Sequence, residues 1–392
     1  MTFLNSVLLI RYLGPSNYGL YAIASAIATM FQMFIDFGSY AMLFRNVYKD
    51  VNDILSSVSE LISFSVVMAL PFLFLIVTVG FFMQLSVTDE LIVVFVGLYS
   101  AVKVLQEIRM GLTVLLKRTG IELLFSIADR LGILIITVTA SILKFTVLDI
   151  VIGYSMLSLV NLIISFMILG RNYDVGIKLV FIKLTRFLEL LKNGMTIAIL
   201  NGSVQFYTKA DVFILARFTS NIYAGEYSAV RNIILASGVI PLSLSNSRMT
   251  EIVHNYENKK LHLVKKTINK MFVILILFSV PVAAFISILA KHIIPILYSR
   301  DYSGASVYLE ILAWLIPVMY LTDTLGRILV SIKKDRGTII VSISSMIINV
   351  ALNLFLVPLI GHQIVAWIAV FSEVIVLIMM LRIAASEGLV GF

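Results

Sequence analysis

Residues 11–21 read Arg-Tyr-Leu-Gly-Pro-Ser-Asn-Tyr-Gly-Leu-Tyr and form a polar, glycine-bounded break between an apolar start and a long apolar helix. The pattern returns 206 residues later, and the aligned pairs are Arg11 with Arg217, Tyr12 with Phe218, Gly19 with Gly225 and Tyr21 with Tyr227. In both copies the arginine ends one apolar segment and the last tyrosine, Tyr21 or Tyr227, begins the next. The repeat predicts a chain made of two related halves.

The composition is that of an integral membrane protein. Hydrophobic residues make up 60% of the 392 residues and charged residues 13%, and the mean hydropathy is +1.03, more than a water-soluble core can bury. Apolar runs of about 20 residues, each enough for a helix to cross about 30 Å of hydrocarbon, fill nearly the whole chain. Because these runs are apolar all round rather than alternating, we predict an all-α integral membrane fold.

The apolar runs predict about twelve transmembrane helices. Residues 1–10 would extend only about 15 Å as a helix, so we expect the first helix to be incomplete. The further predicted spans are 19–44, 58–83, 91–114, 121–143, 147–170, 192–216, 224–247, 269–290, 305–331, 338–358 and 363–384. We therefore expect two pseudo-symmetric six-helix lobes, residues 1–170 and 192–392, joined by a cytoplasmic amphipathic linker at residues 171–191.

Lysine and arginine concentrate in alternate loops, and cytoplasmic loops are the ones that retain positive charge. The basic set includes Lys117, Arg171, Lys259 and Lys265, whereas the opposite loops hold few basic residues. Both ends of a complete chain would thus face the cytoplasm, and the net charge of +8 indicates anchoring at the inner leaflet rather than nucleic acid binding. The basic linker has the spacing of an interfacial helix, which either tethers the lobes or couples their movement.

Three predicted spans carry polar residues along one helical face. These stripes are Ser25, Thr29, Gln32, Asp36 and Ser39 in the second span, Asn201, Gln205, Thr208 and Lys209 in the seventh, and Ser342, Ser345, Asn349 and Asn353 in the eleventh. Such stripes line a water-filled cavity or make hydrogen bonds between helices. We favour a cavity for the two stripes that include charge and interhelical hydrogen bonds for the third.

Charged residues inside a span are costly in lipid and indicate a partner, a cavity or a function. Our candidates for substrate binding are Arg11, Lys103, Arg130, Lys209, Arg231, Gln32, Gln205 and Asn201. Our candidates for ion coupling with H⁺ or Na⁺, or for counter-charges, are Asp36, Glu107, Asp129 and Asp211. Structural alternatives remain open: Lys103 and Glu107, at i and i+4, could neutralise each other, and each carboxylate suits an ion pair equally well.

The sequence indicates no catalytic, metal or cofactor site. The chain has no cysteine, and its four histidines are scattered near predicted span ends. A Gly-x-x-x-x-Gly-Lys-Ser/Thr motif is missing, so we expect no nucleotide hydrolysis. A membrane polymerase or acyltransferase would need a large external loop, and the longest predicted one, about residues 291–304, is short. These observations favour a transporter over an enzyme.

Three stretches resemble the polysaccharide (O-antigen type) flippases of the multidrug/oligosaccharidyl-lipid/polysaccharide exporter (MOP) superfamily. They are residues 11–21, Asp36-Phe37-Gly38, and the segment from Asp211 through Arg217 to Gly225-Glu226-Tyr227-Ser228-Ala229. Glu226 departs from the family pattern, which more often has a small or apolar residue there. The resemblance covers nearly the whole chain and implies two six-helix lobes around a central cavity lined mainly by helices one, two, seven and eight.

The same resemblance implies a function. The expected cargo is an oligosaccharide repeat unit on undecaprenyl diphosphate, moved to the outer leaflet of the cytoplasmic membrane for surface polysaccharides such as the O antigen of lipopolysaccharide. A polysaccharide polymerase is an implied partner. Two alternatives stay open: a cation-coupled drug exporter of the same superfamily, for which an acidic cavity is expected, and a non-transporting assembly protein.

Overall fold

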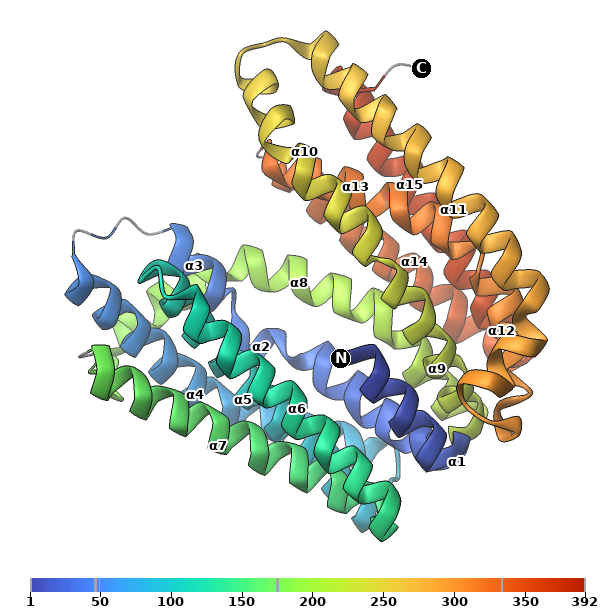
Figure 1. Cartoon of the computed structure of the whole chain (residues 1–392), viewed down its shortest axis with the longest axis horizontal. Helices are drawn as coiled ribbons and strands as arrows, with labels where there is room; N and C mark the ends of the chain where they lie inside the picture. The colour runs from blue at the N-terminus through green and yellow to red at the C-terminus, as the bar shows by residue number, and fades with distance from the viewer. Residues whose placement is uncertain (1, 46–47, 49, 174–175, 333, 391–392) are drawn as a thin grey trace. The chain divides into compact units, whose positions relative to one another are not determined.

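The computed structural model describes residues 2–45, 48, 50–173, 176–332 and 334–390, and within them the regular secondary structure is entirely helical. The helices are α1 (Thr2–Phe31), α2 (Met33–Asp36), α3 (Ser39–Arg45), α4 (Val51–Phe82), α5 (Val87–Leu115), α6 (Thr119–Leu143), α7 (Val147–Tyr173), α8 (Leu184–Phe218), α9 (Asn221–Ser237), α10 (Val239–Glu257), α11 (Leu261–Leu297), η1 (Arg300–Tyr302), α12 (Ala305–Leu312), α13 (Leu315–Ser331), α14 (Asp335–Ile360) and α15 (Ile364–Ser386). Figure 1 shows them in chain order from blue to red.

The helices confirm the prediction of an all-α integral membrane protein. In the part of the chain that the structure describes, 9 helical segments are long and apolar enough to cross a membrane. The pair α12 and α13, bent by 51° at their junction, makes up to 10. The predicted seventh span, residues 192–216, lies within α8, which is 35 residues long but is not among these segments because of its polar residues.

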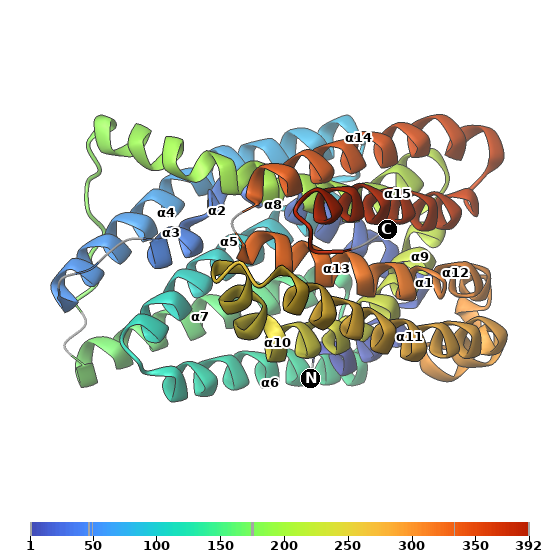
Figure 2. The ribbon, with the colours of Figure 1, turned by 90° about the horizontal axis from the view of Figure 1, so that it is seen from above.

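The chain divides into two compact units. Unit 1 comprises residues 1–13 and 20–205, and unit 2 comprises residues 14–19 and 206–392. In unit 1, α5 packs against α4 and α7, and α6 packs against α7 (Figure 1). In unit 2, α13 packs against α10, α11 and α15, and α14 lies beside α15 (Figure 2).

The repeated stretch of residues 11–21 changes the direction of α1. Gly14 has φ 70° and ψ 169°, a conformation that glycine adopts readily, and Pro15 begins the next helical segment. This helix thus starts at residue 15 and not near residue 19. Residues 14–19 pack within unit 2 on Gly225, where a Cβ would overlap the Pro15 carbonyl oxygen and lie 2.9 Å from the Gly19 nitrogen. Glycine is required here because backbone meets backbone.

The predicted second span, 19–44, is not one helix. The chain breaks after Phe31 and again at Phe37 and Gly38, whose φ angles are 37° and 70°. A Cβ on Gly38 would lie 2.7 Å from the Ile197 Cβ, so the close approach of α8 also requires glycine. The prediction of one continuous polar face from Ser25 to Ser39 is therefore wrong, because the helix axis is interrupted twice within it.

The predicted linker also differs from the structure. Residues 176–183 have no helical structure, and the helix that follows, α8, starts at Leu184 and continues without interruption into the predicted seventh span. Residues 174 and 175 of the linker lie outside the described residues. An isolated interfacial helix at residues 171–192 was therefore the wrong expectation. Arg171 belongs to the last turn of α7, Lys178 and Lys183 lie in the segment without helical structure, and Arg186 and Lys192 lie in the first turns of α8.

Candidate functional site

In unit 1, the candidates Lys103 and Asp129 form an ion pair between α5 and α6. Gln106 donates a hydrogen bond to Asp129 Oδ1 at 3.3 Å, and the Ser158 hydroxyl of α7 donates to the same oxygen at 3.2 Å. Asp129 is buried, and the Lys103 side chain retains 27% of its exposure. This Lys103 cluster joins three helices, so its carboxylate is fully engaged.

Lys103 and Glu107 do not form the ion pair that their spacing allowed as an alternative. The i and i+4 spacing brings two side chains to one side of a helix, but the Lys103 ammonium turns to Asp129 on the neighbouring helix, where Gln106 and Ser158 already orient the carboxylate. Glu107 is exposed, and no carboxylate-to-cation contact within ion-pair distance involves it among the described residues. Its nearest electrostatic neighbours include Asp36 and Lys103.

A second ion pair of unit 1 was not recognised in the sequence. Arg109, 2% exposed, donates to Glu122 at 2.8 Å and to Asn161 at 3.2 Å. The Thr113 hydroxyl also donates to Glu122, at 3.2 Å. Arg109 lies near a predicted span end, where an arginine commonly reaches water, so its burial depends on the position of α6, which the sequence pattern does not reveal.

Asp36 is held by hydrogen bonds that come mostly from residues close to it in sequence. It accepts hydrogen bonds from the backbone amides of Gly38, Ser39 and Tyr40 and from the Asn201 side chain. The carboxylate thus caps the first turn of α3, where free amides favour a negative charge. Asn201, a substrate-binding candidate from another helix, is brought to this cap.

The remaining candidates of unit 1 do not gather at one point in it. Arg11 and Arg130 are exposed on α1 and α6, and Arg130 points away from the buried Asp129 that precedes it, as adjacent helical positions require. Gln32 lies at the break between α1 and α2, where its carbonyl accepts the amide of Asp36 at 3.1 Å. Gln205 lies on α8 and is partly buried.

Unit 2 holds a larger polar cluster, centred on Asp211 of α8, which is 1% exposed. The Tyr227 hydroxyl of α9 donates to Asp211 at 2.6 Å, and Asn353 of α14 donates at 3.0 Å. Asn349 is a further hydrogen-bond partner of this carboxylate. Each donor is neutral, so Asp211 is held by hydrogen bonds and has no cation within ion-pair distance among the described residues.

Glu373 of α15 is the second buried carboxylate of unit 2. It accepts the Tyr207 hydroxyl of α8 at 2.5 Å and the Thr322 hydroxyl of α13. Glu373 was not among the predicted site residues, although a single carboxylate in the predicted span 363–384 was a usable signal. Tyrosine and threonine donors satisfy this group too.

Two cations complete the unit 2 cluster. Arg231 of α9 is electrostatically coupled to Asp211, Glu373, Tyr207 and Tyr227. Lys209 of α8 is partly buried, and the charged group that acts on it is Arg231, another cation. Neither cation is within ion-pair distance of a carboxylate among the described residues. Lys209 and Arg231 are thus like charges that repel each other, while Arg231 is also attracted by the two buried carboxylates.

The polar stripe of the eleventh predicted span, which lies on α14, is buried. Ser342, Ser345, Asn349 and Asn353 are all at most 9% exposed. The two serine hydroxyls donate to carbonyls of their own helix, while Asn353 reaches Asp211 on α8. Hydrogen bonds occupy this stripe, and its two asparagines, Asn349 and Asn353, make the expected bonds between helices by reaching Asp211 on α8. Within the described residues, no group of three or more His, Asp and Glu side chains could hold a metal ion.

Comparison with known families decides the class of protein. The family model for polysaccharide biosynthesis proteins matches residues 1–248, more than half of the chain. The protein belongs to this family. A second model, that of the MatE family, matches residues 197–355. No curated protein matches the chain.

Solved structures agree on the fold of this polysaccharide biosynthesis family member. The structure is similar to an inward-facing MATE multidrug transporter of the MOP superfamily, with TM-score 0.76 and 11% identity over 98% of this chain and 94% of the other. It is also similar to the lipid II flippase MurJ in an inward closed conformation, with TM-score 0.74 and 15% identity over 99% and 86%. A MOP superfamily transporter from Pyrococcus furiosus gives TM-score 0.61 at 13% identity over 98% and 91%. The protein therefore has the fold of the MOP transporters and flippases, which are not enzymes.

Proposed function

We propose that this protein is a flippase that moves undecaprenyl-diphosphate-linked oligosaccharide repeat units across the cytoplasmic membrane by alternating access. The product would serve the assembly of O antigen, capsule or exopolysaccharide. The match to the polysaccharide biosynthesis family and the fold likeness to a lipid II flippase support a lipid-linked cargo. In this proposal both ends of the complete chain face the cytoplasm, and a polysaccharide polymerase consumes the flipped product.

The observation that carries the proposal is the position of Lys209 beside Arg231. Arg231 is partly compensated by the two buried carboxylates, whereas Lys209 is repelled by Arg231 and makes no ion pair among the described residues. The charge of Lys209 becomes favourable when an anion binds beside it. A guanidinium binds phosphate through two parallel hydrogen bonds, and an ammonium adds a point charge. A diphosphate headgroup supplies the required negative charge.

The other candidates receive subsidiary roles in this proposal. Arg11, Lys103, Arg130, Gln32, Gln205 and Asn201 are further contacts for the diphosphate or the sugars. Asp36, Glu107, Asp129 and Asp211 are counter-charges or sites of H⁺ or Na⁺ coupling. Of these carboxylates, Asp129 is ion-paired with Lys103 and Asp36 caps α3, so Asp211 and Glu107 are the better choices for coupling.

Complementation tests the proposal. A strain that lacks its own lipid-linked oligosaccharide flippase would receive the wild type, Lys209→Gln, Arg231→Gln or Lys291→Gln. Lys291 is the control because it loses the same charge at a side chain that is 75% exposed. We expect the wild type and the control to restore surface polysaccharide, and the two cluster variants to lose about tenfold or more, because a charge-assisted hydrogen bond contributes roughly 1.5–3 kcal/mol.

The precursor level identifies the step that fails. The two cluster variants should accumulate the lipid-linked oligosaccharide at normal protein abundance. A wild type that is abundant in the membrane but restores no polysaccharide with any of several glycans would overturn the flippase assignment.

A drug exporter is the second candidate, favoured by the MatE match over residues 197–355 and by the likeness to a MATE multidrug transporter. Its cargo would be an organic cation, which Lys209 and Arg231 would repel. An exporter therefore predicts that Lys209→Gln maintains or improves ethidium efflux from a drug-sensitive strain. Efflux by the wild type together with failed complementation would select this function.

A further inference from the structure

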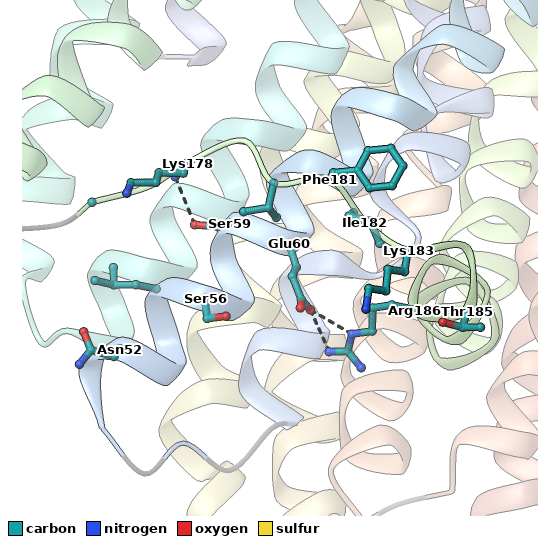
Figure 3. Close-up of a pocket in the computed structure, with 13 residues that line it drawn as sticks. Asn52, Ser56, Ser59, Glu60, Lys178, Phe181, Ile182, Lys183, Thr185 and Arg186 are labelled. Atoms are coloured by element: carbon teal, nitrogen blue, oxygen red, sulfur yellow. Dashed lines mark hydrogen bonds and ion pairs between the residues drawn. The ribbon is translucent and has the colours of Figure 1, made fainter.

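The strap of residues 176–183 is hydrogen-bonded to α4 (Figure 3). The amides of Lys178 and Val180 donate to the hydroxyls of Ser59 and Ser63 at 3.4 and 2.9 Å. These serines are one helical turn apart, about 6 Å along the axis, and two residues of extended chain advance by about 6.6 Å. The two serines thus match the strap in spacing and fix its register on α4.

The first turns of α8 are attached to the same helix. Arg186 donates to Glu60 Oε2 from Nε at 3.0 Å and from Nη2 at 2.9 Å, and its Nη1 donates to Glu189 at 2.9 Å. These carboxylates, Glu189 first, raise the pKa of Arg186 above its usual value. The Phe187 ring of α8 also packs near the Phe64 ring of α4, with 5.1 Å between the ring centroids. The charge of Arg186 is therefore already used within the protein.

A groove of about 640 Å³ lies between α4, the strap and the start of α8; we call it the linker groove. Lys178 and Lys183 line it, and neither ammonium lies within ion-pair distance of a carboxylate in the described part of the chain. Figure 3 shows Lys183 and Arg186 pointing toward Glu60, the acidic residue among those that line the groove. With Arg186 and Glu60 paired, the two lysines leave the groove positively charged.

The depth of the linker groove in a membrane follows from α4. This helix has 32 residues, about 48 Å at 1.5 Å per residue, which exceeds the roughly 30 Å of hydrocarbon. The residues of α4 in the groove lie between Asn52 and Glu60, at one end, while Leu70 and Phe74 further along are 71% and 76% exposed, as lipid-facing side chains are. The groove is therefore at the level of the lipid headgroups.

Exposed apolar side chains flank the lysines. Phe181 is 97% exposed and Leu179 is 72% exposed, both on the strap. Apolar side chains exposed beside basic ones are typical of segments that enter the headgroup and upper acyl region of a bilayer. Positive charge in the groove and apolar surface at its edge together match a molecule with an anionic head and an acyl chain.

We propose that the linker groove binds the phosphate-bearing headgroup of an anionic phospholipid, with Lys178 and Lys183 at the phosphate and Phe181 against the upper acyl chain. The site lies outside the Lys209 and Arg231 cluster and is independent of the proposed transport function. Its occupant is a bilayer lipid and not the transported cargo. Binding would hold the strap at the membrane surface.

Quenching of a local tryptophan by brominated lipid tests the site. The chain has two tryptophans, Trp314 and Trp367, so Trp314→Phe/Trp367→Phe/Phe181→Trp reports on the groove alone. The full chain would be placed in dioleoyl phosphatidylcholine vesicles with increasing dibrominated phosphatidylglycerol, and in the reverse mixture. The control reporter is the native Trp367 of unit 2, which is 57% exposed. It is studied in the variant Trp314→Phe, which retains Trp367 as its tryptophan.

We expect a preference for phosphatidylglycerol at position 181 of about fivefold per lysine, because each basic residue near the surface attracts anionic lipid by about 1 kcal/mol. We expect about equal quenching by the two lipids at Trp367. Lys178→Gln/Lys183→Gln should abolish the preference at position 181. Lys259→Gln/Lys260→Gln, which removes the same charge from exposed residues of unit 2, should leave it unchanged.

Three results would overturn the proposal. One is equal quenching by the two lipids at position 181. Another is a preference that survives the groove variant or falls equally in the control variant. The third is loss of the preference on adding inorganic phosphate at constant ionic strength, which would make the groove a site for free phosphate.

Discussion

In unit 1, Lys103 and Arg109 touch carboxylates directly, whereas in unit 2 the buried carboxylates accept hydrogen bonds from neutral donors. Among the described residues, the cations of the unit 2 cluster make no ion pair at contact distance. Lys103 pairs with Asp129, and Arg109 with Glu122. Asp211 instead receives Tyr227 and Asn353, and Lys209 has Arg231 as its charged neighbour. Both arrangements place ionisable groups at membrane depth.

The difference distinguishes charges that are neutralised by an ion pair within the protein from charges that can still bind a ligand. An ion pair with further hydrogen bonds has little capacity left for another ligand, and breaking it leaves an uncompensated buried group. Cations without direct partners keep their capacity to bind an anion. The two main proposed diphosphate contacts, Lys209 and Arg231, therefore belong to unit 2, and charge removal should have opposite consequences in the two units.

The largest effect is expected for Arg109→Gln in unit 1. Removing one partner of a buried pair costs roughly 3–5 kcal/mol, so the variant should show a much lower Tm and a lower folded yield than the wild type. Heating the purified protein in detergent, followed by size-exclusion chromatography, measures both quantities.

Two matched variants decide whether that loss comes from an orphaned charge. Arg109→Met/Glu122→Met should recover most of the stability, because it removes both charges. Arg248→Gln disrupts an exposed pair with Glu251, where the Arg248 side chain is 48% exposed, and should cost about 1 kcal/mol or less. If Arg109→Gln is no worse than Arg248→Gln, the buried pair is not structural.

Lys103→Gln should destabilise the protein less than Arg109→Gln. The Lys103 side chain is 27% exposed, and Asp129 keeps hydrogen bonds from Gln106 and Ser158 after the substitution. We expect a loss of about 1–2 kcal/mol, between the exposed and the fully buried pairs. The same melting experiment ranks the three variants, and a Tm equal to that of the wild type would place Lys103 with the available cations.

Acidification should destabilise unit 2 slightly through His362. The His362 ring stacks on the Tyr223 ring with 3.7 Å between the ring centroids, and its Nδ1 lies 2.8 Å from the Tyr308 hydroxyl oxygen. Burial of the ring lowers the pKa of His362 below the usual 6.5. The folded state therefore favours the neutral ring, and stability is lost as the pH falls below about 6.5. Tm values at pH 7.5 and 5.5 should differ less in His362→Gln than in the wild type.

The exposed His254 supplies the control for this pH effect. His254→Gln should retain the full difference between the two pH values. An unchanged difference in His362→Gln would show that the stacked ring does not titrate with folding.

The smallest effect on stability is expected for Lys209→Gln. Because Arg231 repels Lys209, removing the lysine charge should leave the Tm unchanged or raise it slightly, while transport falls. A decrease in Tm as large as that of Lys103→Gln would mean that Lys209 stabilises the fold. The two units would then not differ in whether their cations are neutralised within the protein.

The fold was predictable because membrane insertion is decided by long apolar runs, which the sequence displays directly. The break at residues 32–38 was missed because apolar content does not report on axis breaks. Its local signals were Gly38 and the capping carboxylate Asp36. Asp36 was instead assigned to a continuous stripe.

The candidate residues were predictable as a set, but their partners were not. Spacing along one helix suggested Lys103 with Glu107, while the observed partner, Asp129, lies on the next helix. Arg109 and Glu373 required knowledge of which helices adjoin. Charges on different helices can be matched only when the packing is known, so sequence pattern identified polar spans without identifying pairs.

The contact between residues 14–19 and Gly225 has a consequence for expression of half-proteins. The C-terminal half, residues 192–392, is close to unit 2 but lacks residues 14–19, which the chain contributes from near its N-terminus. Expressed alone, that half would leave uncovered the α9 backbone at Asn221 and Gly225, on which Gly19 packs. The two predicted halves are therefore not separable folding units. A side chain at Gly19 or at Gly225 would disturb the backbone contact that joins the two copies of the repeated stretch.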